Sequence, residues 1–229
     1  MNYILDEFSR TWVSPSQYDY LLAKGWRHFG PNFFRYNISI HDDKVCNVLP
    51  LRLRVNDFMP SKSQRKILRK CESFQLSIQK VDIDEVSQKL FHIHKEKFKD
   101  NVPQSIFDFL SKEKTSSTPT TILDLRVFDE DRLIAVSYFG IGENALSSIY
   151  GMFNPDYKSY SLGIFTMLVE IMYAKQMNCD YYYHGYCYDV PSFYDYKKKF
   201  SAMETYIWEK DKWVDYSSFD KAFSIRANS

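Results

Sequence analysis

The chain has 229 residues, a formal net charge of +1, 45% hydrophobic residues and 26% charged residues. This composition is typical of a globular chain with one or two domains and excludes an intrinsically disordered one. Because the net charge is close to zero, contact with nucleic acid must come from a local basic patch rather than from an overall positive field.

The N-terminus, Met1–Glu7, has no basic start followed by an apolar run, and no stretch of about eighteen apolar residues occurs in the chain. We therefore expect no signal peptide, no membrane span and a cytoplasmic location. The cysteines are scattered without a C-x-x-C pair, at Cys46, Cys71, Cys179 and Cys187. This spacing argues against a zinc ribbon and favours free thiols.

Residues 1–80 are expected to form a smaller N-terminal α/β part. Alternating apolar and polar residues predict strands over residues 33–40 and 48–55, and a short strand over 74–79. Between the last two lies the most unusual segment of the chain, residues 57–70.

This segment predicts a basic helix after Pro60. Ser61 or Ser63 can cap it, because a hydroxyl accepts from the unpaired N–H groups of a first helical turn. The helix carries five cations within nine residues, at Lys62, Arg65, Lys66, Arg69 and Lys70. The first four fall on one face at spacings of three and four, whereas Ile67 and Leu68 turn toward the core. Such a face is suited to phosphates; a solvated helix face without a ligand is the alternative.

Residues 81–229 are expected to form the larger C-terminal domain. Its predicted helices span residues 84–98, with Val86, Leu90, Ile93 and Phe98 along one stripe, and residues 105–110, 161–177 and 192–199. Its predicted strands span residues 121–128, 133–140, 146–153, 180–186 and 203–208. Residues 112–121, which lie inside this part, are the best candidate linker in the chain.

The order of these elements is a three-stranded meander, a long helix, a strand, a short helix and a final strand. This order is similar to the core of the GNAT acyltransferases. It implies an α/β (α+β) fold with a mixed, mostly antiparallel sheet and flanking helices. Element order alone does not determine function, so the motifs have to decide it.

Several collinear motifs lie within residues 20–210. They are Gly25-Trp26-Arg27, Phe34-Arg35, Pro50-Leu51-Arg52, Asp57-Phe58 with residues 60–66, Ser148-Ile149-Tyr150, Phe153-Asn154-Pro155-Asp156, Ser161-Leu162-Gly163, residues 181–186, and Tyr196-Lys197 with Phe200. In type and spacing they resemble the aminoacyl-tRNA–protein transferases, the arginyl- and leucyl-transferase family of the N-degron pathway of protein degradation.

The resemblance implies an aminoacyltransferase that moves Arg or Leu from aminoacyl-tRNA to the N-terminal amine of acceptor proteins with acidic or basic first residues. It implies no cofactor, since aminoacyl-tRNA is the co-substrate. Conversion of an ester to an amide is downhill, so the enzyme must mainly align two substrates and remove a proton. An α-amine has a pKa near 8, which a modest base can deprotonate, and the intermediate needs hydrogen-bond donors.

The resemblance also supplies candidate catalytic residues: Tyr186, Tyr196, Lys197, His184 and Asp156. The two tyrosines could donate to the tetrahedral intermediate or only pack, with their hydroxyls on backbone groups. Lys197 could grip a phosphate or a carboxylate. His184 and Asp156 could accept a proton, or serve as a core histidine and a loop cap.

The expected tRNA-binding residues are Arg52, Lys62, Gln64, Arg65, Lys66, Arg69, Ser161 and Gly163. The last two lie at an expected helix start, where N–H groups bind anions or are simply capped. A CoA-dependent acetyltransferase is disfavoured, because residues 158–164 offer only one glycine for a pyrophosphate cradle. The remaining alternatives are a Fem-type peptidyl transferase that uses aminoacyl-tRNA, and a non-catalytic binder of tRNA or protein N-termini.

The chain departs from the family pattern in three places. The family's usual cysteine-rich N-terminal part can hold zinc or an iron–sulfur cluster, but here only Cys46 precedes Pro50-Leu51-Arg52. One thiolate cannot complete a four-ligand site, so we expect no bound metal. Pro191 replaces a usual cysteine, and Ser159 and Tyr160 replace basic residues that often precede Ser161.

Overall fold

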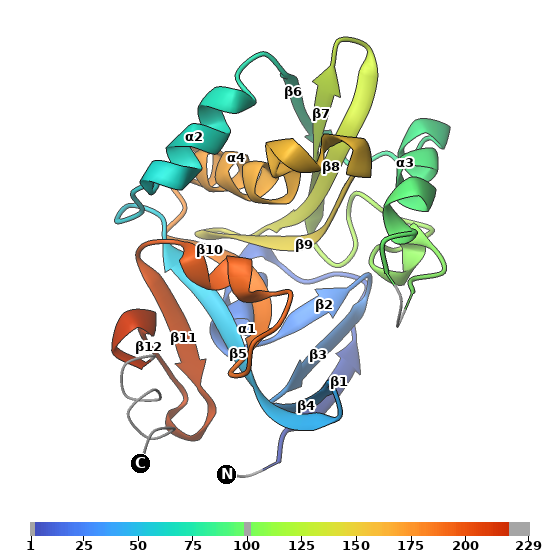
Figure 1. The fold of residues 1–229 in the computed structure, drawn as a ribbon. Coiled ribbons are helices and arrows are strands. Elements are labelled where there is room, and N and C mark those ends of the chain that lie inside the picture. Colours follow the sequence, from blue (N-terminus) through green and yellow to red (C-terminus); the bar gives the residue numbers. More distant parts are fainter. Residues whose placement is uncertain (1–2, 99–101, 220–229) are drawn as a thin grey trace.

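The computed structural model describes residues 3–98 and 102–219. Within them, nine strands form one large sheet in the order β12-β11-β5-β10-β9-β8-β7-β6, with β4 paired to β5 (Figure 1). These strands are β4 (Ile38–His41), β5 (Lys44–Arg54), β6 (Gln75–Lys80), β7 (Thr121–Asp129), β8 (Arg132–Ile141), β9 (Ala145–Phe153), β10 (Tyr181–Tyr188), β11 (Met203–Ile207) and β12 (Lys212–Asp215).

All neighbouring strands of this sheet are antiparallel except β9 and β10, which run parallel. The mixed, mostly antiparallel sheet expected from the sequence is therefore confirmed. No helix in the described part of the chain is long and apolar enough to cross a membrane.

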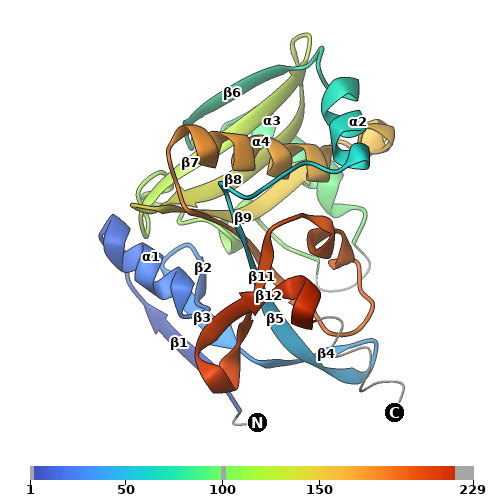
Figure 2. The same cartoon turned by 90° about the vertical axis from the view of Figure 1, so that its left-hand side faces the viewer.

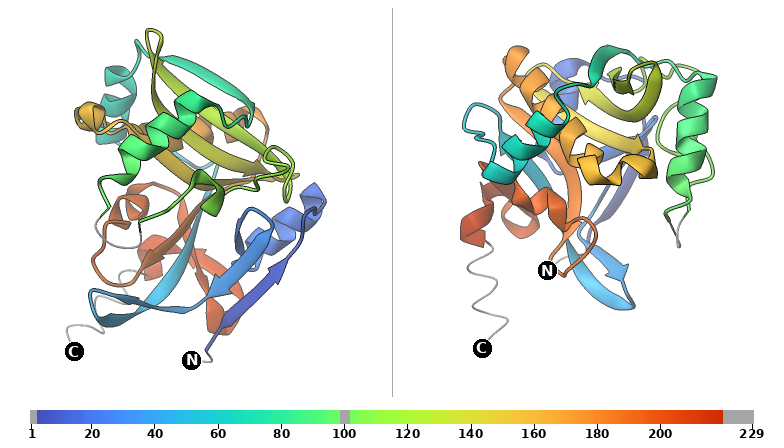
Figure 3. Two further views of the ribbon diagram at one scale, coloured as in Figure 1. Left: turned by 90° about the vertical axis from the view of Figure 1, so that its right-hand side faces the viewer. Right: turned by 45° about the horizontal axis from the view of Figure 1, so that its top comes forward.

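Two helices cover opposite faces of this sheet (Figures 1 and 3). α4 (Leu162–Gln176) packs on the face that carries Leu125 and Val127, in the larger hydrophobic core. α3 (Glu85–Lys95) packs on the face that carries Ile122 and Val136, in a second core. Successive residues of a strand point to opposite faces, so the apolar run of β7 supplies both cores.

The buried stripe of α3 differs from the expected one. Leu90 is buried as expected, but Val86 and Ile93 are 52% and 41% exposed. The inner face instead carries His94, whose Nδ1 lies 2.9 Å from the backbone N of Phe153 and accepts its hydrogen. This polar contact with the end of β9 fixes a rotation of the helix that apolar periodicity alone does not predict. The helix expected over 105–110 is a single 3-10 turn, Ile106–Asp108.

A smaller sheet and one helix lie beside the parallel strands, at the left in Figure 2. The sheet has the order β1 (Leu5–Ser9), β3 (Asn32–Tyr36) and β2 (Arg27–Phe29), and α1 (Pro15–Ala23) packs with it. The single strand expected over residues 33–40 is divided between the two sheets, as β3 and β4. α1 was not expected, although Ser14 and Gln17 form a capping box at its start.

The N-terminal strands do not stay apart from the later ones. β5 lies between β10 and β11 in the large sheet, and α2 (Lys62–Lys70) then packs against α4 (Figure 2). The expected linker, residues 112–121, is irregular up to the start of β7 and is docked, because the N–H of Val13 donates to the carbonyl of Pro119. A division into domains near residue 80 stays a prediction.

Candidate active site

The parallel strands β9 and β10 separate after a short seam. They pair only through Tyr181 with Ala145, Tyr182 with Leu146 and Tyr183 with Ser147. Beyond these pairs β9 continues along β8, whereas β10 continues along β5 with an irregularity between Tyr183 and Gly185. The backbone groups that would have paired at this fork are therefore free to face other partners.

Arg27, from β2, reaches the start of this fork. Its Nη1 donates to Oγ of Ser147 at 2.6 Å, and its Nη2 donates to the carbonyl oxygen of Ser148. Burial lowers the pKa of its guanidinium, although an arginine still keeps its charge. The sequence motif Gly25-Trp26-Arg27 contained this residue, but no role for it was predicted.

Lys197, from the 3-10 turn η3 (Asp195–Lys199), approaches the fork from the other side. Its Nζ donates to the carbonyl oxygen of Tyr186 at 3.3 Å. A Cβ on Gly185 would lie 3.3 Å from this Nζ and 3.6 Å from Nη2 of Arg27, so both cations flank the same glycine. Burial, and then the charge of Arg27, lower the pKa of Lys197 to about 8.

His184 lies in the irregular part of β10 and is fully enclosed. Its ring packs between Tyr182 and Phe200, at centroid distances of 4.8 and 4.9 Å, and neither ring nitrogen has a hydrogen-bond partner among the described residues. Burial, followed by the charges of Lys197 and Arg27, holds the pKa of His184 well below its usual value. The histidine is therefore neutral at physiological pH.

Glu170, from the middle of α4, is a buried carboxylate beside the fork that sequence reasoning missed. Its Oε2 accepts a hydrogen bond from the hydroxyl of Tyr182 at 2.7 Å, and its Oε1 accepts one from Ser137. Burial raises the pKa of Glu170 to about 7. The signal that could have identified it is a single acidic residue inside the apolar run from Phe165 to Ile171.

The two candidate tyrosines lie in different surroundings. The hydroxyl of Tyr186 donates to the carbonyl oxygen of Gly25 at 2.6 Å, so this tyrosine connects β10 to the small sheet. Tyr196 packs half-buried against the larger core, and burial raises the pKa of its hydroxyl to about 12, with smaller contributions from Tyr194 and Glu170. Among the described residues, the hydroxyl of Tyr186 is bound to the backbone and that of Tyr196 is not.

Asp156 lies beyond the far end of β9, in the 3-10 segment η2 (Pro155–Tyr160). Its side chain is exposed and faces Arg132, with 3.7 Å between the charged atoms. The structure therefore brings His184, Tyr186, Tyr196 and Lys197 together around the fork and leaves Asp156 outside this group. A solvent-facing carboxylate paired to arginine fits the alternative role of a loop residue better than that of a base.

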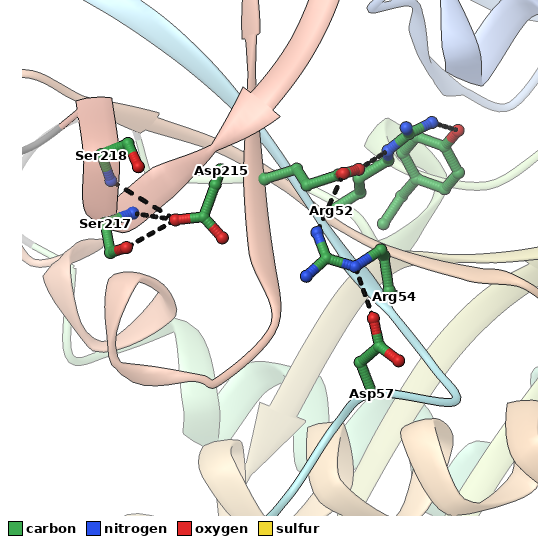
Figure 4. Close-up of polar contacts among 8 residues, drawn as sticks. Arg52, Arg54, Asp57, Asp215, Ser217 and Ser218 are labelled. Atoms are coloured by element: carbon green, nitrogen blue, oxygen red, sulfur yellow. Dashed lines mark hydrogen bonds and ion pairs between the residues drawn. The ribbon is translucent and has the colours of Figure 1, made fainter.

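Arg52 is held by its own protein rather than presented to a ligand. Its Nε lies 2.6 Å from Glu204, and its guanidinium stacks over the rings of Tyr181 and Trp213 at 3.8 and 4.4 Å. Figure 4 shows the neighbouring Arg54, which connects Glu204 to Asp57. Only 8% of Arg52 is exposed, so these partners disfavour the expected phosphate contact.

The cationic helix α2 has the expected form. Ser61 caps it and forms a capping box with Gln64, while Ile67 and Leu68 pack against the larger core. Gln64 is thereby buried, and its side chain also donates to the carbonyl of Lys199. Gln64 therefore stabilises the start of the helix, and its buried side chain is not placed to bind a phosphate.

The exposed face of α2 borders an open depression of about 520 Å³. The depression is lined by Ser61, Lys62, Ser63, Lys66 and Arg69. Arg65 lies beside it, with its guanidinium donating to the carbonyl of Pro60 at 2.6 Å. Three lysine and arginine side chains around one hollow form a local positive surface on a nearly neutral protein.

This surface continues to the start of α4. Lys70, at the end of α2, donates to the carbonyl of Ser159 at 2.8 Å and covers the ring of Tyr160. Ser161 caps α4 in a left-handed conformation (φ 56°) without a side-chain hydrogen bond, and a Cβ on Gly163 would contact only the ring of Phe153. Through Lys70 this helix start therefore lies next to the cationic face of α2.

The cysteines lie apart in the fold, all of them buried and unpaired. Within residues 3–98 and 102–219, no group of three or more His, Cys, Asp or Glu side chains could hold a metal ion.

Comparison with known protein families agrees with the sequence motifs. A family model described as "Arginine-tRNA-protein transferase, C terminus" matches residues 85–207, which is more than half of the chain, and its N-terminal counterpart matches residues 2–66. The chain belongs to the arginine-tRNA-protein transferase family. The resemblance recognised in the sequence is confirmed, and the protein is a transferase that moves an aminoacyl group from tRNA to a protein N-terminus.

Relatives of this transferase carry a more specific name. An aspartate/glutamate leucyltransferase of Campylobacter jejuni is 30% identical over 170 residues, which cover 72% of this chain and 70% of the relative. One of the same name from Marinobacter nauticus is 28% identical over 199 residues, 85% of this chain and 81% of the relative. Among solved structures, one described as the crystal structure of FemX overlaps with a TM-score of 0.47 and 11% identity, over 77% of this chain and 61% of that chain.

Proposed function

We propose that this transferase moves leucine from leucyl-tRNA to the N-terminal amine of proteins whose first residue is Asp or Glu. The observation that carries this choice of donor and acceptor is the similarity to the aspartate/glutamate leucyltransferase of Campylobacter jejuni over about two thirds of both chains. A cationic centre at Arg27 and Lys197 supports an acidic acceptor, and we place the reaction in the cytoplasm, where charged tRNA is made.

The transfer reaction requires only a weak general base. The acceptor amine attacks the ester carbonyl, the new C–N bond forms, the C–O bond to the 3′ oxygen breaks, and that oxygen takes up a proton. Because the α-amine has a pKa near 8, part of it is already neutral at pH 7. The protein must therefore align the two substrates and stabilise the oxyanion of the intermediate.

The fork between β9 and β10 provides groups for both tasks. Tyr196 presents a hydroxyl that is not bound to the backbone and can donate to an oxyanion, whereas Arg27 and Lys197 present cationic groups that can orient an acidic acceptor. Lys62, Lys66 and Arg69 on α2 would hold the tRNA backbone at a distance from this centre. Positioning of the ester carbonyl near the hydroxyl of Tyr196 then leaves Arg27 and Lys197 for the acceptor.

Mass spectrometry of peptides incubated with a total pool of charged tRNA tests this proposal. Four peptides that differ only in the first residue, Asp, Glu, Lys or Arg, report the acceptor, and the mass added to each reports the amino acid transferred. An N-acetylated Asp peptide is the control, because its amine is blocked. We expect leucine on the Asp and Glu peptides only. Addition of arginine, or of leucine to the Lys and Arg peptides, would contradict the proposal.

A further inference from the structure

Arg27 and Lys197 form a pair of partly buried cations. The buried carboxylate of Glu170 is near enough to Arg27 to interact with it electrostatically, but the two form no salt bridge in the part of the chain that the structure describes. Each of the two cations approaches Gly185, within 3.6 and 3.3 Å of where a Cβ would be. Within the described residues neither side chain forms a salt bridge, although ten such pairs occur elsewhere in the structure. The third basic group at this place, His184, is neutral and has no hydrogen-bond partner.

Two neighbouring cations of this kind destabilise the folded protein when no ligand is bound. Charged side chains that are removed from water are normally paired, because the loss of hydration disfavours an isolated ion and like charges add repulsion. After burial, the charge of Arg27 lowers the pKa of Lys197 and so disfavours the charged form of the lysine. An anion bound between them would remove both penalties, so the arrangement favours a ligand with a negative charge.

The two side chains retain free donors for such a ligand. A guanidinium has five N–H donors and an ammonium three. Arg27 uses two, to Ser147 and Ser148, and Lys197 uses one, to Tyr186. Both residues remain partly accessible to solvent, so a ligand can reach them from the surface.

The surroundings bear on which anion would bind. Gly185 has a φ of 96°, and a Cβ there would lie only 3.3 Å from Nζ of Lys197, so the two cations approach the bare backbone of this glycine closely. The rings of Tyr182 and Phe200 pack on the neighbouring His184, so the strand around Gly185 has aromatic surroundings. A planar carboxylate can accept hydrogen bonds from a guanidinium and an ammonium together, whereas a phosphodiester flanked by two riboses requires an open groove like that along α2.

We propose that Arg27 and Lys197 together bind the side-chain carboxylate of the acceptor's first residue and thereby select Asp and Glu. This inference rests on the proposed function, because it assigns the acceptor of that reaction to a particular pair of residues. The main competing occupant is a phosphate of the tRNA 3′ end, which the test below separates from the acceptor.

The test measures discrimination rather than activity alone. Leucyl transfer is followed for two matched peptide pairs, Asp against Asn and Glu against Gln, which differ in charge but hardly in shape. For Lys197→Met we expect the ratio of kcat/KM between the acidic and amide peptides to fall about ten- to a hundredfold. Lys197→Arg should restore most of the ratio, and any loss common to both peptides cancels.

Lys198→Met is the matched control on the same turn. Lys198 pairs with Asp195 at 2.7 Å and does not approach Gly185, so the ratio should stay at the wild-type value. Circular dichroism and thermal unfolding confirm that each variant is folded. An unchanged ratio in Lys197→Met, together with a raised KM for leucyl-tRNA, would assign the pair to a tRNA phosphate and overturn the inference.

A binding measurement keeps this inference separate from the proposed reaction. Calorimetric titration of the Asp and Asn peptides into the protein without tRNA should show tighter binding of the Asp peptide, lost about tenfold or more in Lys197→Met. If the wild type transfers leucine to no peptide, the proposed function fails while this titration still decides the inference. Equal affinity for the Asp and Asn peptides would refute it whether or not transfer occurs.

Discussion

The hydroxyl of Tyr182 on β10 donates a hydrogen bond to the carboxylate of Glu170 on α4, with 2.7 Å between the two oxygens. Because Ser137 on β8 donates to the other carboxylate oxygen, one buried acidic group connects α4 to both β8 and β10. A carboxylate in this position adds a polar contact that fixes the helix relative to the strands, and it also makes the core sensitive to pH.

Glu170→Gln should make stability less dependent on pH. Burial raises the pKa of Glu170 to about 7 from 4.5, so the folded protein binds this proton more tightly than the unfolded chain does. The stabilisation is complete below about pH 4.5 and is lost as the pH rises through 7, at a total of roughly 3 kcal/mol for a shift of this size. Denaturant unfolding at several pH values between about 5 and 8 should show this decline in the wild type and a flatter profile in the variant. Glu113→Gln, on an exposed loop, serves as the control and should keep the decline; the same slope in Glu170→Gln would show that another group titrates.

Reversal of the α2 cations should weaken tRNA binding without unfolding the protein. Lys62, Lys66 and Arg69 are exposed around the depression, so their replacement by Glu removes up to three phosphate contacts. The slope of log affinity against log salt concentration should then decrease in magnitude by about 2 to 3. Filter binding with deacylated tRNA at several salt concentrations measures both affinity and slope.

The control is a second triple variant that changes the net charge by the same amount but at lysines outside α2. Lys80, Lys89 and Lys112 are also exposed lysines, on β6, α3 and a loop, and their replacement by Glu should leave the salt slope near the wild-type value. If both triple variants weaken binding equally, the effect is one of net charge, and α2 is only a solvated helix face.

The tyrosines Tyr186 and Tyr196 should respond differently to the loss of their hydroxyls. Tyr186→Phe removes a 2.6 Å hydrogen bond to Gly25, so we expect a loss of about 1 kcal/mol in the free energy of unfolding and little change in kcat. Tyr196→Phe should leave stability nearly unchanged and lower kcat about tenfold or more, because its hydroxyl would donate only to the intermediate. Transfer assays measure kcat and denaturant unfolding measures stability for both variants. A lower kcat in Tyr186→Phe with a lower stability in Tyr196→Phe would contradict the prediction and assign the catalytic hydroxyl to Tyr186.

The purified protein should carry no stoichiometric zinc or iron. The thiols of Cys46, Cys71 and Cys187 each contact a different backbone carbonyl, at Ser39, Tyr160 and Leu49, so no two of these three share a site. Elemental analysis of protein purified without a metal-affinity step measures this. About one tightly held metal per chain, retained after dialysis against a chelator, would contradict the expectation.

The strands and helices of the second half were predictable because their patterns are local. The meander from β7 to β9, the long helix α4 and the strand β10 all lie within two or three residues of their predicted bounds. α1 was missed because its capping box, Ser14 with Gln17, precedes a mixture of aromatic and polar residues without a clear apolar stripe. The break between β3 and β4 depends on which sheet each strand joins, and local alternation carries no information about that.

The residues of the candidate site also differ in whether local sequence patterns could predict that they lie together. His184, Gly185 and Lys197 could be placed near one another, because a strand and the turn after it keep them close. Arg27 reaches them only through the packing of β2 beside the fork, which no local spacing predicts. Glu170 is a single acidic residue in an apolar helix, and the sequence does not show why it is there. The structure explains it, because Ser137 and Tyr182 donate hydrogen bonds to its carboxylate.

The position of β5 determines the order in which the sheet can be completed. Residues 44–54 pair with β4 next to them, but their other partners, β10 and β11, begin at residues 181 and 203. During synthesis the apolar segment of β5 therefore stays unpaired with β10 and β11 until residues beyond 203 have emerged from the ribosome. Folding dominated by such distant contacts is slow, so refolding yield in vitro should depend strongly on protein concentration.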